Sequence, residues 1–411
     1  DVYKRQKLGL IADRFYGHPS RQQHVIGVTG TDGKTSVTHY LAQALSGDDA
    51  CGLLGTLGYG VYGQLQPPTH TTPDAVRLQA ELAQLRDSGV KTVAMEVSSH
   101  ALHQHRSDGV AFNTAILTHL SRDHLDYHGS IEAYADAKRR LFSMPGLETA
   151  VLNVADEFGR QLAGQLQNAV RVIVDGRHED CAGLSPDWMA LEAGVPRSGG
   201  LTIRQNTSWG SVEFESSLLG EFNASNLMAA LGGLLAAGLP LNDAVERLSR
   251  VSTVAGRMEL FEQRHAPRVV VDYAHTPHAL ETVLRALRPH CSGRLICLFG
   301  AGGDRDTGKR PQMGSIAERY ADLVVLTSDN PRSERPQVIL DEIAAGFLEP
   351  QRVECIIDRG VAIDVVIAEA GADDMVLVAG KGHEETQQIG DRRLVFSDRE
   401  RVRQALRRYA G

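Results

Sequence analysis

The sequence predicts an α/β protein, in which a P-loop ATPase-like domain with a central, mostly parallel sheet is followed by a C-terminal Rossmann-like α/β domain. Three observations lead to this prediction. From residue 25 onward, short apolar runs that end in Gly, Ser or Asp alternate with helical patterns, as in parallel strands joined by helical crossovers. With 411 residues, the chain is longer than a domain with a single hydrophobic core usually is, so two or three domains are expected. The segment 255–259, Ala-Gly-Arg-Met-Glu, separates two such alternating series.

Polar residues follow most of the predicted strands. In open α/β sheets, ligands bind at the carboxyl ends of the strands, so these residues are candidates for a site. The first series predicts strands at 25–29, 92–97, 113–118 and 150–153, an antiparallel stretch near 201–214 within the less regular segment 171–215, and helices at 223–237 and 241–248. The second series predicts strands at 269–272, 295–299, 323–327, 353–357 and 375–379.

Composition narrows the classes of function. A formal net charge of −8 argues against a general affinity for nucleic acid or for an anionic membrane, so we expect small-molecule substrates and neither of those partners. Five cysteines, never spaced as C-x-x-C, are typical of a reducing compartment. No apolar run reaches the roughly 18 residues of a membrane span. We therefore expect a cytoplasmic protein, and a monomer.

A glycine-rich loop follows the first strand and precedes a helical pattern. It comprises Gly30, Thr31, Asp32, Gly33, Lys34, Thr35 and Ser36. Glycines let backbone N–H groups approach phosphate oxygens, Lys34 supplies a positive charge, and Thr35 offers a hydroxyl to magnesium. The strict Walker pattern has glycine where this chain has Val28, so the loop is a shorter variant. The alternative is a plain glycine-rich turn, but the order of strand, loop and helix favours nucleotide binding.

Two further polar groups follow strands of the same series. Glu96 ends the strand 92–97, and a dense polar segment at 121–128 follows the next strand and contains His124. A carboxylate at the edge where the phosphate loop lies is suited to bind magnesium. The alternative for the segment around His124 is a hydrogen-bonded loop without a ligand.

A lysine lies on the apolar stripe of the helix predicted at 130–142. Lys138 is four residues from Tyr134 and three from Leu141, on the face that also carries Ile131 and Phe142. Such a lysine often extends its amine to solvent. If it is buried instead, its pKa falls, and the neutral amine can capture carbon dioxide as a carbamate, an anionic ligand for a second magnesium.

Several segments together resemble the Mur ligases, and within that family the MurE type, over residues 8 to the C-terminus. They are residues 30–35, 95–100, 121–129, 134–138, 256–259, 272–277 and 380–384. The resemblance implies an ATP-dependent ligase that adds meso-diaminopimelate to a UDP-muramoyl dipeptide during cell-wall synthesis. It also implies a domain division into 1–20, a remnant of a UDP-binding domain, 21–255, which binds ATP, and 256–411, which binds the amino acid.

The resemblance assigns roles to individual residues. It implies that Thr35 and Glu96 hold one magnesium, that His124 and carbamylated Lys138 hold another, and that Asn226, Arg257 and His275 contribute to ATP binding. Contacts with the UDP-muramoyl dipeptide are implied for Thr71, Thr72, Ser98, Gln104 and Arg106. For Thr71 and Thr72 the alternative is turn chemistry, and for Asn226 and His275 it is capping or core hydrogen bonding.

The segment Asp329, Asn330, Pro331 and Arg332 resembles the tetrapeptide with which the family recognises diaminopimelate, and Arg305, Gly380 and Glu384 would complete that site. An arginine fork binds a carboxylate through two hydrogen bonds, and diaminopimelate carries a second carboxylate that lysine lacks. Two departures from the family, Asp32 in place of asparagine and Pro73 in place of glycine, predict altered local contacts.

Four other functions stay open at this point. The chain could be a lysine-adding Mur ligase, or a folylpolyglutamate synthase-like ligase with the same ATP machinery. It could be a nucleotide-driven switch or motor, or an ATP-binding remnant without activity. Amino-acid-dependent release of ADP separates the ligases from the others.

Overall fold

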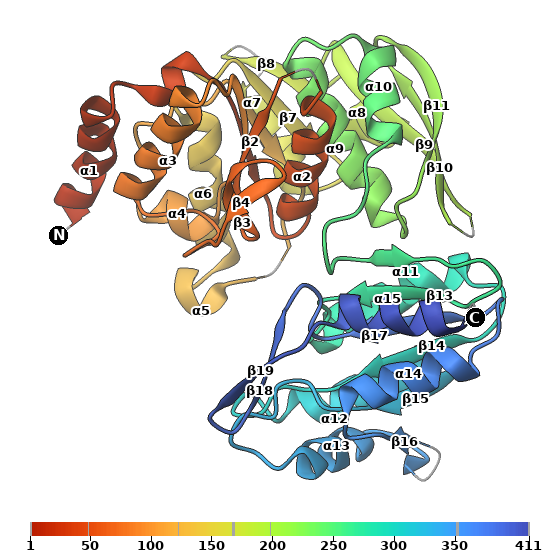
Figure 1. Ribbon diagram of the computed structural model, residues 1–411. Coiled ribbons are helices and arrows are strands. Elements are labelled where there is room, and N and C mark those ends of the chain that lie inside the picture. Colours follow the sequence, from red (N-terminus) through yellow and green to blue (C-terminus); the bar gives the residue numbers. More distant parts are fainter. Residues whose placement is uncertain are drawn as a thin grey trace. The chain divides into compact units, whose positions relative to one another are not determined.

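The computed structural model describes residues 2–47, 49–121, 123–166, 169–197, 199–350 and 353–409 (Figure 1). Arg122, within the polar segment around His124, lies outside them. The chain divides into two compact units, which are described separately. Unit 1 extends to Ser252. Unit 2 begins at Thr253 and also includes Pro196–Leu201 and Leu218–Glu221.

Unit 1 is built on an 11-stranded sheet with the order β11-β10-β9-β8-β7-β6-β1-β5-β2-β3-β4. The neighbouring strands from β9 to β2 pair in parallel, and β3 and β4 add antiparallel strands at one edge. The strands are β1 (His24–Thr29), β2 (Cys51–Gly55), β3 (Gly58–Val61), β4 (Gln64–Gln66), β5 (Thr92–Glu96), β6 (Thr114–Leu117), β7 (Thr149–Asn153), β8 (Arg171–Gly176), β9 (Asp187–Arg197), β10 (Gly200–Thr207) and β11 (Gly210–Ser216).

Helices cover this sheet. One core joins inward-facing residues of the strands to α3, to η2 and to α7. Helices α2 and α9 pack against each other, and a Cβ at Gly233 of α9 would meet the side chains of Leu41 and Ile116. The helical elements are α1 (Val2–Phe15), η1 (Pro19–Gln22), α2 (Lys34–Leu45), α3 (Ala75–Asp87), α4 (Ser99–His103), α5 (Leu125–His128), α6 (Ile131–Arg139), η2 (Arg140–Ser143), α7 (Glu157–Leu166), α8 (His178–Cys181), α9 (Phe222–Ala236) and α10 (Leu241–Ser249).

Unit 2 has a six-stranded sheet with the order β12-β13-β17-β14-β15-β16, parallel except for β12. Alternate residues of β13 face opposite sides: Val270 belongs to the core under α11, α12 and α13, whereas Val269 and Val271 belong to the core under α14 and α15. The strands are β12 (Glu259–Phe261), β13 (Arg268–Asp272), β14 (Leu295–Phe299), β15 (Leu323–Leu326), β16 (Glu354–Cys355) and β17 (Met375–Ala379).

The helical elements of unit 2 are α11 (Pro277–Leu287), η3 (Arg288–His290), α12 (Lys309–Tyr320), α13 (Pro336–Ala344), α14 (Arg359–Glu369) and α15 (Asp398–Tyr409). A separate hairpin is formed by β18 (Thr386–Ile389) and β19 (Arg392–Val395). Figure 1 shows α14 and α15 side by side in blue.

The predicted α/β class is confirmed, and so are the predicted central strands. The strand predicted at 353–357 contains only two residues in β16. Strands β2 to β4, β8, β9, β12 and the hairpin of β18 and β19 were not predicted from the sequence. Strand β8 lies in the segment 171–215, whose sequence pattern is less regular. The apolar pattern of β2 and β3 is interrupted by Gly52, Gly55, Gly58 and Gly60, so periodicity does not reveal these two strands. Each glycine lets a neighbouring side chain or backbone atom approach closely.

Asp175, near the end of β8, is only 3% exposed, and its Oδ2 has no hydrogen-bond partner among the residues that the structure describes. Burial, with a contribution from Asp156, raises the pKa of Asp175 to about 7. Ionisation therefore costs the folded chain free energy once the pH exceeds the pKa of the unfolded state, and this cost stops growing above pH 7.

We expect Asp175→Asn to stabilise the protein more at high pH than at low pH. The gain in free energy of unfolding should be about 2–3 kcal/mol larger at pH 8 than at pH 5. Urea unfolding of both proteins at the two pH values measures this difference. The exposed Asp391→Asn serves as the control, and a gain from Asp175→Asn that does not depend on pH would contradict the prediction.

Candidate functional site

The phosphate loop of unit 1 is tightly folded. Gly30 and Gly33 have φ values of 150° and 82°. A Cβ at Gly30 would lie 1.8 Å from Oγ1 of Thr118, which donates a hydrogen bond to the carbonyl of Asp32 at 2.6 Å. Side chains are therefore excluded where the backbone turns into α2, as a loop that wraps phosphate requires.

Lys34 begins α2 and reaches back over this loop. Its Nζ donates to the carbonyls of Gly30 and Thr31 at 3.0 and 2.8 Å. Thr35 and Ser36 lie on the same first helical turn. Asn226 of α9 lies against the loop as well, because a Cβ at Gly33 would come within 2.5 Å of its Oδ1. Asp32 faces His119, with Oδ2 and Nε2 3.4 Å apart.

Glu96, at the end of β5, is held in a buried oxygen-rich setting. It is 1% exposed and accepts hydrogen bonds from the hydroxyl of Thr35 at 2.9 Å and from the amide and hydroxyl of Thr56 at 2.7 and 3.1 Å. Burial raises the pKa of Glu96, although these hydrogen bonds and the charge of Lys34 act in the opposite direction. A buried carboxylate beside a threonine hydroxyl is a donor set that suits magnesium.

Lys138 does not extend to solvent, so the alternative of an amine in water is wrong. The residue is 1% exposed, and Nζ donates to the carbonyl of Gly30 at 2.6 Å. Burial and the nearby charge of Lys34 hold the pKa of Lys138 well below its usual range, against the attraction of Asp123 and Asp32. A buried amine with a lowered pKa is a nucleophile, and here it touches the phosphate loop.

Tyr134 links this amine to the segment around His124. Nζ of Lys138 lies 4.4 Å from the centre of the Tyr134 ring, whose hydroxyl is 3.2 Å from Oγ1 of Thr31. The ring of His124 is centred 6.2 Å from the same tyrosine, and its Nε2 lies 3.3 Å from Oδ2 of Asp123. His124 has a left-handed backbone with φ 52° at the start of α5.

The sequence analysis missed a group of aromatic side chains beside this segment. His100, His103, Tyr127 and His128 are in ring contact with one another or with His124. Burial and the neighbouring cationic groups lower the pKa of His128 to about 4. Two of these histidines stand in α4 and His128 ends α5, so the contacts depend on tertiary packing that no spacing in the sequence reveals.

The five residues predicted to contact the muramoyl dipeptide lie in one hydrogen-bonded group around Glu96. Thr72 donates to the carbonyl of Glu96 at 2.9 Å, and Ser98 donates its amide to the Thr72 hydroxyl at 3.1 Å. Thr71 accepts from Thr56 at 3.2 Å. Arg106 donates to the carbonyl of Thr72 at 3.2 Å and to Oε1 of Gln104, whose amide nitrogen donates to Tyr127 at 2.8 Å.

In unit 2, Arg257 and His275 both lie against Tyr273. The guanidinium of Arg257 is 4.7 Å from the centre of the Tyr273 ring, and Nδ1 of His275 is 2.8 Å from the tyrosine carbonyl. Asp272 fixes the backbone next to both residues. Its carboxylate accepts hydrogen bonds from the amide of Met258, which follows Arg257, and from the amide of Ala274, which precedes His275, both at 2.7 Å. A role of Arg257 and His275 in ATP binding remains a prediction.

The residues predicted to bind diaminopimelate gather at the carboxyl ends of β15 and β17. The amide of Gly303 donates to the carbonyl of Asn330 at 2.9 Å, and Nη1 of Arg332 donates to the carbonyl of Gly303 at 2.5 Å. A Cβ at Gly302 would lie 2.9 Å from Arg332 and 3.7 Å from Arg305. The segment with Arg305 and the segment with Asn330, Pro331 and Arg332 are therefore joined.

Gly380 and Glu384 lie in the same group. A Cβ at Gly380, where φ is 116°, would come within 2.6 Å of Oδ2 of Asp329. Glu384 accepts from Nδ2 of Asn330 at 2.9 Å and from Nζ of Lys381 at 2.8 Å. Burial opposes ionisation of Glu384, but these bonds and the Lys381 charge hold its pKa below the usual range. Sequence reasoning gave no role to Lys381.

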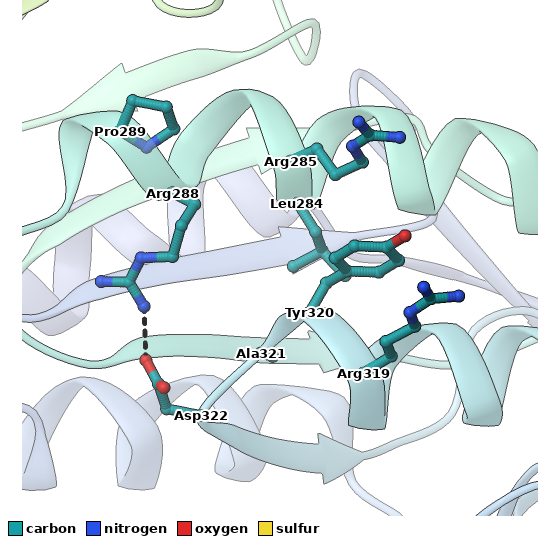
Figure 2. Close-up of a pocket in the computed structure, with 8 residues that line it drawn as sticks. All are labelled: Leu284, Arg285, Arg288, Pro289, Arg319, Tyr320, Ala321 and Asp322. Carbon is teal, nitrogen blue, oxygen red and sulfur yellow. Dashed lines mark hydrogen bonds and ion pairs between the residues drawn. The ribbon is translucent and has the colours of Figure 1, made fainter.

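Unit 2 also has a depression, whose lining residues are drawn in Figure 2. It has a volume of about 420 Å³ and is lined by Leu284, Arg285, Arg288, Pro289, Arg319, Tyr320, Ala321 and Asp322. Its arginines are engaged locally: Arg288 donates to Asp322 at 2.6 Å and to the carbonyl of Gly293 at 2.7 Å. None of the predicted site residues lines it.

Among the described residues, no helix is long and apolar enough to cross a membrane.

Comparisons with known proteins find similarity over nearly the whole chain. The family model of the Mur ligase middle domain matches residues 28–234, and that of the Mur ligase glutamate ligase domain matches residues 256–382. The chain is 53% identical over 406 residues to the UDP-N-acetylmuramoyl-L-alanyl-D-glutamate--2,6-diaminopimelate ligase of Alkalilimnicola ehrlichii. This similarity covers 98% of this chain and 80% of that protein. The ligase of the same name from Coxiella burnetii is 46% identical, with coverage of 98% and 82%.

Solved structures show the same similarity. A structure of UDP-N-acetylmuramoyl-L-alanyl-D-glutamate--2,6-diaminopimelate ligase superposes with a TM-score of 0.78 and 37% identity, covering 99% of this chain and 83% of that one. Folylpolyglutamate synthase from Mycobacterium tuberculosis superposes with a TM-score of 0.69 at 19% identity, which shows a shared fold alone; coverage is 91% and 92%. On the two family matches and on the similarity to these relatives over 98% of its own length, the chain belongs to the Mur ligase family.

Proposed function

We propose that this chain is an ATP-dependent amide ligase that adds meso-2,6-diaminopimelate to UDP-N-acetylmuramoyl-L-alanyl-D-glutamate during the synthesis of peptidoglycan precursors. The observation that carries the proposal is the placement of Glu96 and Lys138 on the phosphate loop. Glu96 contacts Thr35, where the loop enters α2, and Lys138 contacts Gly30, where the loop leaves β1. The terminal phosphate of ATP lies at such a loop, so both groups act where phosphoryl transfer occurs.

The reaction proceeds in two steps. An oxygen of the D-glutamyl carboxylate attacks the γ-phosphorus of ATP, the bond to the β-phosphate oxygen breaks, and ADP leaves. The neutral amine of diaminopimelate then attacks the acyl carbon, the carbon–oxygen bond to phosphate breaks, and an amide forms with release of phosphate and a proton. Lys34 and the loop amides stabilise the negative charge in the first step.

The donor groups of the site suit magnesium. Thr35 and the buried carboxylate of Glu96 would hold one ion, and His124 with a carbamate on Lys138 would hold another. Bound magnesium would offset the charge of the phosphates during transfer. The carbamate would form by attack of the neutral Nζ of Lys138 on carbon dioxide with loss of one proton from the nitrogen, and the lowered pKa of Lys138 favours this neutral amine.

Charge complementarity supports diaminopimelate as the amino acid. Arg332 and Arg305 supply guanidinium groups for the second carboxylate, which lysine lacks, and Glu384 supplies a carboxylate for an ammonium group. We assign residues 21–255 to ATP and dipeptide binding and residues 256–411 to amino-acid binding. We place the enzyme in the cytoplasm, where ATP is available and where its five free cysteines stay reduced.

The proposal is tested by incubating the purified protein with ATP, magnesium, bicarbonate, the UDP-linked dipeptide and one amino acid at a time. Mass spectrometry should find the tripeptide product with diaminopimelate, with one ADP released for each amide formed. Equal use of lysine would reject the specificity. ADP release that does not depend on any amino acid would reject the ligase and favour a nucleotide-driven switch.

A further inference from the structure

Lys381 follows β17 and is completely buried, yet no role has been given to it so far. Its side chain is 0% exposed, and Nζ donates to Oε2 of Glu384 at 2.8 Å, to the carbonyl of Thr386 at 2.7 Å and to Oδ1 of Asn330 at 3.3 Å. An ammonium group has three protons, so these three acceptors satisfy it fully. A buried charge that is this well satisfied occupies one fixed position.

One consequence concerns the orientation of Asn330. Its Oδ1 accepts one hydrogen bond from Nζ of Lys381 and another, at 2.9 Å, from the backbone amide of Gln388. These two donors fix the position of the side-chain oxygen. The nitrogen Nδ2 then points to Glu384, to which it donates at 2.9 Å. A rotated amide would place its N–H groups against two donors, which is unfavourable.

A second consequence concerns Glu384. Its Oε2 accepts from both Lys381 and Asn330, whereas Oε1 accepts no hydrogen bond from any residue that the structure describes. The Glu384 side chain is 33% exposed. One carboxylate oxygen is thus anchored in the interior, and the other is presented outward.

We propose that Lys381 is a positioning residue for amino-acid recognition, which holds Asn330 and Glu384 so that Oε1 of Glu384 receives an ammonium group of the incoming diaminopimelate. This inference rests on the proposed function and deepens it. The positive charge of Lys381 also compensates one carboxylate in a site where Asp329 lies close to Gly380. The second carboxylate of diaminopimelate therefore meets the guanidinium groups of Arg332 and Arg305 with less opposing negative charge nearby.

The test replaces Lys381 by methionine, which fills similar space without charge or donors. The KM for diaminopimelate should rise about 10-fold or more, while the KM for ATP and kcat change by about 3-fold or less. The exposed Lys91→Met is the control and should behave like the parent. If Lys381→Met does not fold, as judged by thermal unfolding, Lys381→Gln keeps a donor, lacks the charge and should show the same selective rise.

A double-mutant cycle separates positioning from a general structural role. Glu384→Gln alone should raise the KM for diaminopimelate, and Lys381→Met added to it should cost little more, because the group on which Lys381 acts has already lost its charge. Additive effects, or an equal rise in the KM for ATP, would overturn the inference. So would an unchanged KM for diaminopimelate in Lys381→Met, provided that the parent enzyme ligates diaminopimelate. A parent that ligates no diaminopimelate would overturn the proposed function and this inference together.

Discussion

Replacement of Lys138 by methionine is expected to abolish ligation, with a loss in kcat of about 10³-fold or more. Methionine preserves the packing of this nearly fully buried position but supplies neither an amine nor a carbamate beside Gly30. Bicarbonate in excess should not restore activity, because the nitrogen that would carry the carbon dioxide is gone. The rate of tripeptide formation at saturating ATP, dipeptide and diaminopimelate measures the effect.

Two controls accompany this experiment. Lys91→Met removes an exposed lysine and should leave the rate unchanged. In the parent protein, ¹³C-labelled bicarbonate should give a carbamate signal by NMR that disappears in Lys138→Met. A variant that retains turnover within about 10-fold of the parent would show that Lys138 is structural, since a lost metal ligand costs more than that.

Arg332→Ala is expected to lower kcat/KM for diaminopimelate by about 10²-fold, because a carboxylate would lose a hydrogen-bonded cationic partner. The KM for ATP should stay the same, since the residue bonds within the group of Asn330 and Gly303 and is not among those predicted to bind ATP. The use of lysine, which we expect to be weak in the parent, should change little, so the preference for diaminopimelate over lysine should largely disappear. Competition between the two amino acids in one assay, read by product mass, measures this ratio directly.

The matched control is Arg335→Ala, an exposed arginine three residues further along the chain. It should leave both kcat/KM values unchanged. If Arg332→Ala lowers the use of lysine as strongly as that of diaminopimelate, the residue supports the loop and does not read the second carboxylate. That result would remove the basis for the specificity.

Helical periodicity in the sequence located Lys138 correctly. Its position on the stripe with Tyr134 leaves open whether the amine extends to solvent or is buried. The structure shows it buried, with Nζ bonded to the carbonyl of Gly30. The central strands were equally predictable, since strands buried on both faces are continuous apolar runs. The carbamate and the magnesium ligands remain predictions.

Other features depend on packing between segments that are far apart in the sequence. The contact between Asn226 and Gly33 joins α9 to the phosphate loop across nearly 200 residues, and only the resemblance to a family drew attention to it. Lys381 lies within a recognised segment, but it is buried between Asn330 and Thr386 because β18 returns beside residues 329–332, and periodicity does not reveal this contact. The histidines of α4 and α5 were missed for the same reason.

The claim that ATP activates the substrate carboxylate is tested most directly with a UDP-linked dipeptide whose D-glutamyl side-chain carboxylate carries ¹⁸O. Because the attacking oxygen remains on phosphorus when the amine displaces phosphate, the released phosphate should contain one ¹⁸O atom for each amide formed. Mass spectrometry of the phosphate gives the count. Unlabelled phosphate accompanied by amide product would contradict an acyl phosphate and with it the mechanism derived from the phosphate loop.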